Sequence, residues 1–221
     1  FGQYCKKTVM ISFVFKLIEF PGKWYNCHQV RKNATFIGKA QILRHAHIRP
    51  FRGSTAKDII IGNDFRFFSG TICSQNQGKI TIGEHCKIGY DCKILCANSI
   101  CIGNYVILAD NITVCDNNNH SVNPQDCALM YQTPWNSDYR GWKYSQSAPI
   151  IIENNVWIGS NVRICKGVTI GQGAVIAACS VVTKDVPANS IAAGNPAKIV
   201  KTDIDQLPRL LSDDILEQYG K

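Results

Sequence analysis

The 221-residue chain has no apolar run long enough to cross a bilayer as a helix. Its most apolar early stretch, VMISFVFKLIEF at 9–20, is far short of the roughly 20 residues that a span needs, and Lys16 interrupts it. We therefore expect a packing helix there and no stable membrane span. Long basic runs are missing too. The net charge of +8 suggests an anionic partner, and without such runs nucleic acid is not expected.

Sequence motifs for metal and nucleotide binding are also missing. The 11 cysteines form no CxxC pair and the five histidines are scattered, so we expect no structural zinc site. There is no GxxxxGK[ST] and no GxGxxG after a strand, which argues against ATP or NAD chemistry. Because the cysteine count is odd and no secretory signal is visible, reduced and buried thiols in a cytoplasmic protein are expected instead of a disulfide scaffold.

An aliphatic residue recurs at every sixth position in two long stretches, with one two-residue slip. These positions are Ile82, Ile88, Ile94, Ile102, Leu108 and Val114, and then Ile152, Ile158, Ile164, Ile170, Ile176 and Val182. A small or β-branched residue follows four positions later, as at Cys86 and Val156. A period of six fits neither a helix nor an alternating strand. It predicts an all-β solenoid, a parallel β-helix whose aliphatic residues point inward; an antiparallel sandwich with accidental spacing is the alternative.

The first array breaks at a polar histidine. Its phase predicts the next inward position at 120, which holds His120, and the repeat resumes only at Ile152. We therefore expect a loop over about 120–149, extruded from the solenoid. Five aromatic residues argue that this loop is ordered, and they could stack on a sugar or simply anchor the loop. They are Tyr131, Trp135, Tyr139, Trp142 and Tyr144.

The segment IGSNVRICKGVTIGQGAVIAACSVVTKDV, followed by AAGNPAKIVK, carries a family resemblance. It resembles the C-terminal half of the left-handed β-helix, hexapeptide-repeat acyltransferases, and most of all the maltose, galactoside and polysaccharide O-acetyltransferases. The match is dense over about 80–201, weaker over 33–79 and absent at both ends. The resemblance implies a left-handed coil, which is an exception to the right-handed crossover rule, and a homotrimer with active sites between subunits. It also implies acetyl-CoA-dependent transfer to a hydroxyl of a sugar, glycan or glycan precursor such as a cell-surface polysaccharide, without a metal.

The resemblance also assigns roles to single residues. His120 matches the general base, since a neutral imidazole can accept the hydroxyl proton. Asp116 is a candidate to orient that ring, although a backbone carbonyl would serve as well. Trp157 matches an active-site wall, or else it packs at a coil corner. Contacts to coenzyme A fall on Ser160, Ala178, Thr183, Lys184, Lys198 and Lys201, and the candidates for acceptor stacking are Trp135, Tyr139 and Trp142.

The expected organisation is an N-terminal segment at 1–32, partly helical, a β-helix domain at 33–201, and a helical cap at 202–221 that covers the open end. Three alternatives stay open. The histidine is farther from the following tryptophan than in the sugar acetyltransferases, so an N-acetyltransferase of an amino sugar or a xenobiotic such as an antibiotic is the first. The second is a non-catalytic β-helix scaffold. The third concerns the basic segment RHAHIRPFRG at 44–53, which is the rival to His120 and could bind an anion or form a patch on the acceptor side.

Overall fold

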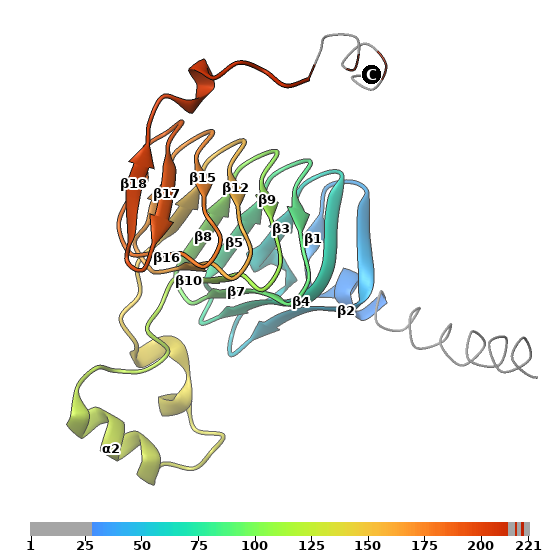
Figure 1. The fold of residues 1–221 in the computed structure, drawn as a ribbon. Helices are drawn as coiled ribbons and strands as arrows, with labels where there is room; N and C mark the ends of the chain where they lie inside the picture. Colours follow the sequence, from blue (N-terminus) through green and yellow to red (C-terminus); the bar gives the residue numbers. More distant parts are fainter. Residues whose placement is uncertain (1–27, 212–214, 216–217, 219–221) are drawn as a thin grey trace, which may run out of the picture.

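The computed structural model describes residues 28–211, 215 and 218, and in it short parallel strands stack into the coils of a prism (Figure 1). Through most of the prism each strand pairs with the third strand further along the chain. Thus β8 (Ser99–Ile102) pairs with β11 (Ile150–Ile152), and β9 (Ile107–Leu108) pairs with β12 (Trp157–Ile158). One coil is therefore three strands long, and the prism has three faces. This confirms a solenoid of parallel strands.

The three faces are made of the following strands. The first face contains β1 (Thr35–Phe36), β3 (Ile59–Ile61), β5 (Lys79–Ile82), β8, β11 and β14 (Thr169–Ile170). The second contains the start of β4 (Phe65–Gln75), β6 (Lys87–Ile88), β9, β12, β15 (Val175–Ile176), β17 (Ile191–Gly194) and β18 (Ala197–Lys201). The third contains β7 (Cys92–Cys96), β10 (Thr113–Cys115), β13 (Arg163–Ile164) and β16 (Val181–Val182). Both β4 and its partner β2 (Ala40–Phe51) are long enough to turn the corner between the second and third faces.

The interior of the prism is the ladder that the period of six predicts. Every predicted inward residue, from Ile82 to Val182, is at most 2% exposed. The offset-four positions are buried as well, down to the small residues Ala174 and Ser180. Equivalent side chains stack from coil to coil because the parallel register places them opposite one another, as Ile94, Val114 and Ile164 show.

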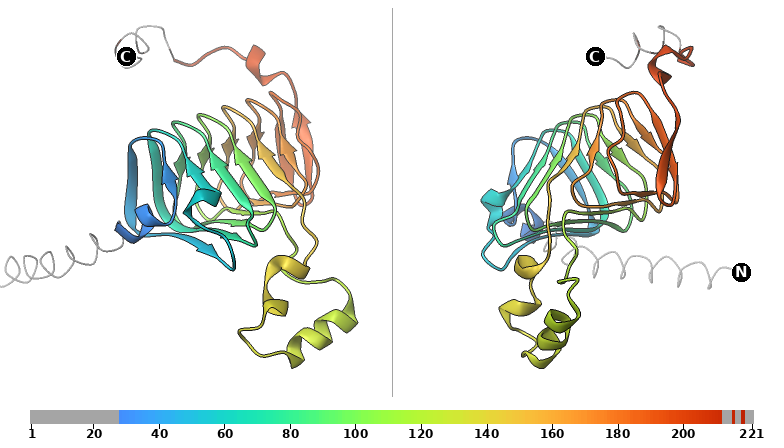
Figure 2. Two further views of the ribbon diagram at one scale, coloured as in Figure 1. Left: turned by 180° about the vertical axis from the view of Figure 1, so that it is seen from behind. Right: turned by 90° about the vertical axis from the view of Figure 1, so that its left-hand side faces the viewer.

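His120 does not enter that ladder. Ile152 pairs with Ile102 and takes the inward place that the phase assigned to residue 120, while His120 is exposed. The intervening segment is extruded as expected and projects away from the prism (Figures 1 and 2). It contains α2 (Pro124–Gln132) and the 3-10 turns η2 (Asp138–Arg140) and η3 (Trp142–Tyr144).

The expectation of buried thiols is right for part of the set. Five described cysteines are buried, namely Cys73, Cys86, Cys92, Cys96 and Cys115. Cys101 and Cys179 are exposed, because Cys101 points outward from β8 and Cys179 occupies a left-handed corner with φ of 62°. No disulfide is present within 28–211.

Residues 28–32 are helical, and the expected packing helix at 9–20 lies outside the described residues. The part of the chain that the structure describes contains no helix long and apolar enough to cross a membrane.

The helical cap expected over 202–221 is not confirmed. The described part of that stretch contains one 3-10 turn, η4 (Ile204–Gln206), and the separate helical residues Ile215 and Gln218. Instead the antiparallel strand β18 pairs with β17 at the end of the second face.

Candidate functional site

The projecting loop leaves the prism through a narrow neck that Asp116 holds in place. Its buried carboxylate accepts the backbone N–H of Ala97 and of Asn98, each at 2.8 Å. Its backbone carbonyl accepts the N–H of Ala148 at 2.9 Å, which ties the two strands of the neck together. Hydrogen bonds from N–H groups to an ionised acceptor are the stronger kind. Asp116 therefore fixes the loop exit, and no hydrogen bond within 28–211 joins it to the ring of His120.

The asparagines before His120 continue this anchoring into the loop. Asn117 donates through Nδ2 to Asp116 Oδ1 at 3.0 Å and accepts the N–H of Asn119 at 2.9 Å. Asn117 also forms an antiparallel bridge with Ser147. These contacts set the backbone immediately ahead of His120, so the run of asparagines has a structural reason.

His120 faces a cavity of about 210 Å³ that is built entirely from the loop. Ser121 Oγ bonds to Asp126 Oδ2 at 2.6 Å, which holds the start of α2 beside the histidine. On the other side the rings of Tyr139 and Tyr144 stack with centroids 5.1 Å apart. The lining residues are His120, Ser121, Asp126, Cys127, Leu129, Met130, Tyr139, Gly141 and Tyr144.

The structure brings one of the three acceptor candidates, Tyr139, to this cavity. Trp135 is 84% exposed and lies under the guanidinium of Arg140, 5.0 Å from ring centroid to Cζ, and neither it nor Trp142 lines the cavity. Sequence reasoning missed the apolar wall from α2, Leu129 and Met130. The weak amphipathic pattern of that nine-residue helix carried no signal that would have found it.

The expected donor residues fall on two edges of the third face. The corner between the second and third faces, the Ser160 edge, comprises 109–110, 159–160, 177–178 and 193–194. Ser160 and Ala178 lie there in successive coils, since Cys179 N–H donates to Ser160 O at 2.9 Å. Lys198 joins them, because it pairs with Ala193 across β17 and β18, whereas Lys201 pairs with Ile191 at the far end of those strands.

Thr183 and Lys184 lie on the other edge of that face, the loop edge, which comprises 116–117, 147–148, 165–166 and 183–184. The loop neck enters here, with Gly167 N–H donating to Ala148 O at 3.2 Å and Cys165 N–H donating to Val182 O at 3.0 Å. Both Thr183 and Lys184 are exposed. The structure therefore groups them with the neck that carries His120. Trp157 projects from the second face, 54% exposed.

Comparison with known proteins supports the resemblance to hexapeptide-repeat acyltransferases. The bacterial transferase hexapeptide repeat (six repeats) matches residues 149–184. Galactoside O-acetyltransferase of Escherichia coli is 36% identical over 122 residues, which cover 55% of this chain and 53% of that enzyme. Over the stretches that these matches cover, the chain is therefore similar to hexapeptide-repeat acyltransferases. The predicted resemblance to the galactoside branch is confirmed.

Two solved structures share the hexapeptide-repeat fold. A hexapeptide-repeat acetyltransferase of Vibrio cholerae is 27% identical, with a TM-score of 0.51 over 77% of this chain and 73% of that one. AntD, an N-acyltransferase of Bacillus cereus, is 22% identical, with a TM-score of 0.62 over 86% and 93%. The chain spans about half the length of the curated relatives that it matches, from 42% to 53%.

The basic cluster at 44–53 lies on β2 in the first coils of this hexapeptide-repeat prism. His45, His47 and Arg49 alternate with the buried residues Ala46 and Ile48, so they share the outward side of the strand. Burial lowers the pKa of His47, and the neighbouring charges of Arg49 and then His45 lower it further. Within the described residues no three His, Cys, Asp or Glu side chains converge to hold a metal ion.

Proposed function

We propose that the protein is an acetyl-CoA-dependent O-acetyltransferase that acts, as a homotrimer with a left-handed coil, on a hydroxyl of a sugar, glycan or glycan precursor. The observation that carries this proposal is the position of His120, which lines a loop cavity whose neck enters the same edge of a hexapeptide-repeat prism as Thr183 and Lys184. The likeness to an enzyme named galactoside O-acetyltransferase supports a sugar hydroxyl as the acceptor.

The proposed chemistry needs one general base and a set of hydrogen-bond donors for the oxyanion. The neutral imidazole of His120 takes the proton as the acceptor oxygen attacks the thioester carbonyl, and backbone N–H groups stabilise the tetrahedral oxyanion. The C–S bond then breaks, and the sulfur leaves as the CoA thiol with the proton that the imidazolium returns. The exposed ammonium groups of Lys184, Lys198 and Lys201 are suited to the phosphates of coenzyme A.

A second copy of the chain would complete this site. In a single prism the donor residues occupy two different edges of the third face, with Ser160, Ala178 and Lys198 on one and Thr183 with Lys184 on the other. A donor site between adjacent copies can combine the Ser160 edge of one prism with the loop edge of the next. Exposed apolar side chains on the second face, Trp157 at 54% and Ile107 at 44%, are suited to contact between copies.

The test is release of CoA thiol from acetyl-CoA in the presence of sugars, capsular oligosaccharides, amino sugars and antibiotics. His120→Ala should lower kcat by about 10²- to 10⁴-fold, the range for a general base, and leave CoA binding within twofold. His45→Ala removes another exposed histidine and serves as the matched control. Unchanged turnover in His120→Ala would remove the histidine from the mechanism. Absence of CoA binding in a titration would favour a non-catalytic scaffold.

Transfer to an amine is the second candidate. The apolar wall of the His120 cavity, with Leu129, Met130 and two tyrosines, is suited to an amine acceptor of low polarity such as an antibiotic. In this case a neutral amine would attack the thioester carbonyl, and the same histidine would take the proton that the nitrogen carries once the N–C bond has formed. This candidate is supported if amino sugars or antibiotics release CoA thiol and sugars without an amino group release none.

A further inference from the structure

A second cavity, of about 600 Å³, lies where the projecting loop meets the first coils of the prism. It is separate from the His120 cavity, and its wall is polar. The lining residues come from three distant segments and are Arg52, Gly53, Asn76, Gln77, Asp138 and Lys143. Nothing in the proposed transfer step uses them.

Arg52 is held rigidly at this cavity. Its Nη1 donates to Ser137 O at 3.1 Å and to Asp138 Oδ1 at 3.3 Å, and its Cζ lies 5.3 Å from the ring centroid of Phe51. The side chain is only 17% exposed. Within 28–211 no hydrogen bond uses its Nε or Nη2, so this edge of the guanidinium still has N–H donors. A planar guanidinium edge matches the two oxygens of a carboxylate or phosphate.

Asn76 supplies a second available donor. Its Nδ2 is buried and has no hydrogen-bond partner in the described part of the chain. A buried donor without an acceptor is costly, so an acceptor is expected at this atom when the site is filled. The turn that carries it is fixed, because Asn76 N–H donates to Arg52 O at 3.1 Å and Gln77 N–H donates to Ser54 Oγ at 2.9 Å.

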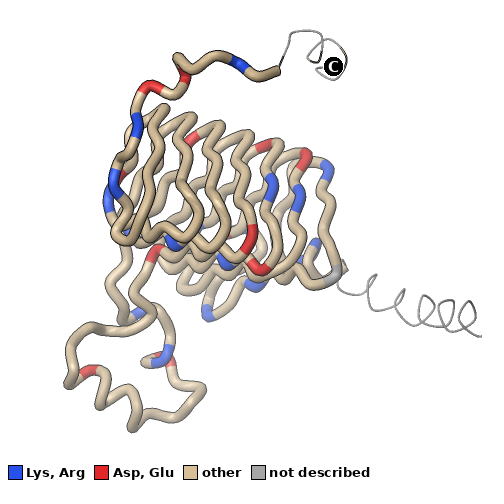
Figure 3. Tube along the Cα trace, in the orientation of Figure 1, with Lys and Arg blue, Asp and Glu red and all other residues tan. Residues whose placement is uncertain are grey.

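The charges at the cavity favour an anion. Arg52 and Lys143 outnumber the single carboxylate of Asp138. Charged residues are sparse along the projecting loop (Figure 3). Residues 120–149 include four charged side chains, and two of them, Asp138 and Lys143, line this cavity. Since Asp138 already bonds to Arg52 through Nη1, the net charge presented to a ligand is positive.

This cavity adjoins the one that contains His120. Gly141 lines the His120 cavity, and a Cβ placed on it would lie 3.1 Å from Arg52 Cδ and 3.2 Å from Nη1. The two cavities therefore lie on either side of the segment 138–143. A glycan acceptor that crosses this segment could present a hydroxyl to His120 while a charged group rests beside Arg52.

We propose that the Arg52–Asn76–Lys143 cavity is an acceptor subsite for an oxyanion, a carboxylate or a phosphate, attached to a sugar. This inference rests on the proposed function, which it sharpens by making the acceptor an anionic sugar or glycan. The guanidinium edge and the ammonium group bind the oxyanion, and Asn76 Nδ2 donates to it or to a neighbouring hydroxyl.

Binding to the intact chain tests the subsite with three matched probes, glucuronic acid, glucose 6-phosphate and glucose. We expect at least one anionic sugar to bind tenfold or more tightly than glucose, and added salt to weaken that binding. The carboxylate and phosphate probes show which oxyanion is preferred. Isothermal titration with acetyl-CoA present and absent gives the dissociation constants.

Two variants locate the binding. Asn76→Asp keeps the size of the side chain and tolerates its left-handed backbone, φ 55°, but puts a carboxylate beside Arg52. It should weaken the anionic sugar at least tenfold, and Lys143→Gln should weaken it threefold or more. Lys57→Gln removes an exposed lysine outside the cavity and should change the affinity less than twofold. Thermal melts establish that each variant is folded.

The outcomes separate this inference from the proposed function. If neutral sugars are acetylated with dependence on His120 while anionic sugars bind no better than glucose, the subsite is wrong and the transferase stands. If anionic sugars bind with dependence on Asn76 but release no thiol, the subsite stands and the transferase is wrong. Weakened binding of CoA itself in Asn76→Asp would overturn the acceptor subsite by making the cavity part of the donor site.

Discussion

Arg52 and Asp138, which are 86 positions apart, form an ion pair with Nη1 3.3 Å from Oδ1. This contact ties the projecting loop back to the first coils of the prism. Because Asp138 is 86% exposed, the pair contributes at most about 1 kcal/mol to global stability. Its effect is therefore local and falls on the loop.

The first prediction concerns this tether. Arg52→Gln loses the ion pair together with the bond to Ser137 O, whereas Asp138→Asn loses only the charge. We expect hydrogen–deuterium exchange over 133–145 to rise in both variants, and more in Arg52→Gln, while the exchange of the prism strands is unchanged. Equal exchange in wild type and Arg52→Gln would contradict the tether.

The loop neck gives a second prediction. Asp116→Ala removes the acceptor of the Ala97 and Asn98 N–H groups, so we expect the free energy of unfolding to fall by about 1–3 kcal/mol in urea melts. Asp116→Asn keeps one acceptor oxygen and should lie between. Asp126→Ala, which loses a single exposed bond to Ser121 in the same loop, is the control and should stay within about 0.5 kcal/mol. If Asp126→Ala loses as much unfolding free energy as Asp116→Ala, the two hydrogen bonds to Asp116 are not the cause of the loss.

The cysteines give a third prediction, on reactivity. Burial, the largest cause, raises the pKa of Cys92 to about 11, so its thiol is protonated and shielded at pH 8. Cys101 and Cys179 are exposed and should be alkylated first by iodoacetamide, as peptide mass spectrometry can measure in the native protein. If Cys92 in the native protein is alkylated as fast as Cys101, the interior of the prism is accessible to iodoacetamide and the prediction is wrong.

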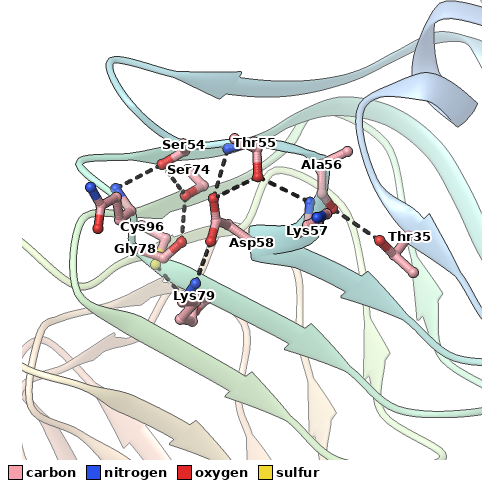
Figure 4. Close-up of polar contacts among 11 residues, drawn as sticks. Thr35, Ser54, Thr55, Ala56, Lys57, Asp58, Ser74, Gly78, Lys79 and Cys96 are labelled. Atoms are coloured by element: carbon pink, nitrogen blue, oxygen red, sulfur yellow. Dashed lines mark hydrogen bonds and ion pairs between the residues drawn. The ribbon is translucent and has the colours of Figure 1, made fainter.

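Asp58 gives the fourth prediction, on pH. A hydrogen bond from Lys79 is the largest cause that lowers the pKa of this carboxyl, followed by the N–H of Thr55 at 2.7 Å (Figure 4). A folded pKa below the unfolded value of about 3.9 means that the network stabilises the fold above that pH. The stabilisation is lost as the pH falls through the folded value.

The measurement for Asp58 is a set of denaturant melts at pH 6, 4 and 3. The gap in unfolding free energy between wild type and Asp58→Asn should be largest at pH 6 and should close toward pH 3. Asp205→Asn, an exposed change in η4, should show no such closing gap. A gap that stays constant with pH would mean that the charge of Asp58 contributes nothing.

Much of the fold was predictable because the repeat is a local constraint. The same inward position recurs once per face and coil in the narrow prism, so the positions from Ile82 to Val182 could be assigned as inward from spacing alone. The period assigns residue 120 to the next coil, but the chain leaves the prism there before that coil begins. Ile152 fills that place through its register with Ile102, which is a contact between residues 50 positions apart.

The candidate site was predictable as a set of residues but not as an arrangement. The break of the repeat at His120 and the long aromatic loop indicated a functional segment, and Tyr139 does line its cavity. Which edge carries Ser160 and which carries Thr183 depends on how the corners stack from coil to coil. The spacing of six assigns these residues to edges only when it is also known that each coil has three faces.

The sequence by itself determined a hexapeptide solenoid, its inward ladder and the place where a loop interrupts it, because each depends on residues close together in the chain. Only the tertiary structure decided that Asp116 holds the loop neck through Ala97 and Asn98, and that Arg52, Asn76 and Lys143 line one cavity. Those partners come from different coils and from the loop, and no local pattern records them. They meet because stacking parallel coils bring distant segments side by side and an extruded loop folds back onto the first of them.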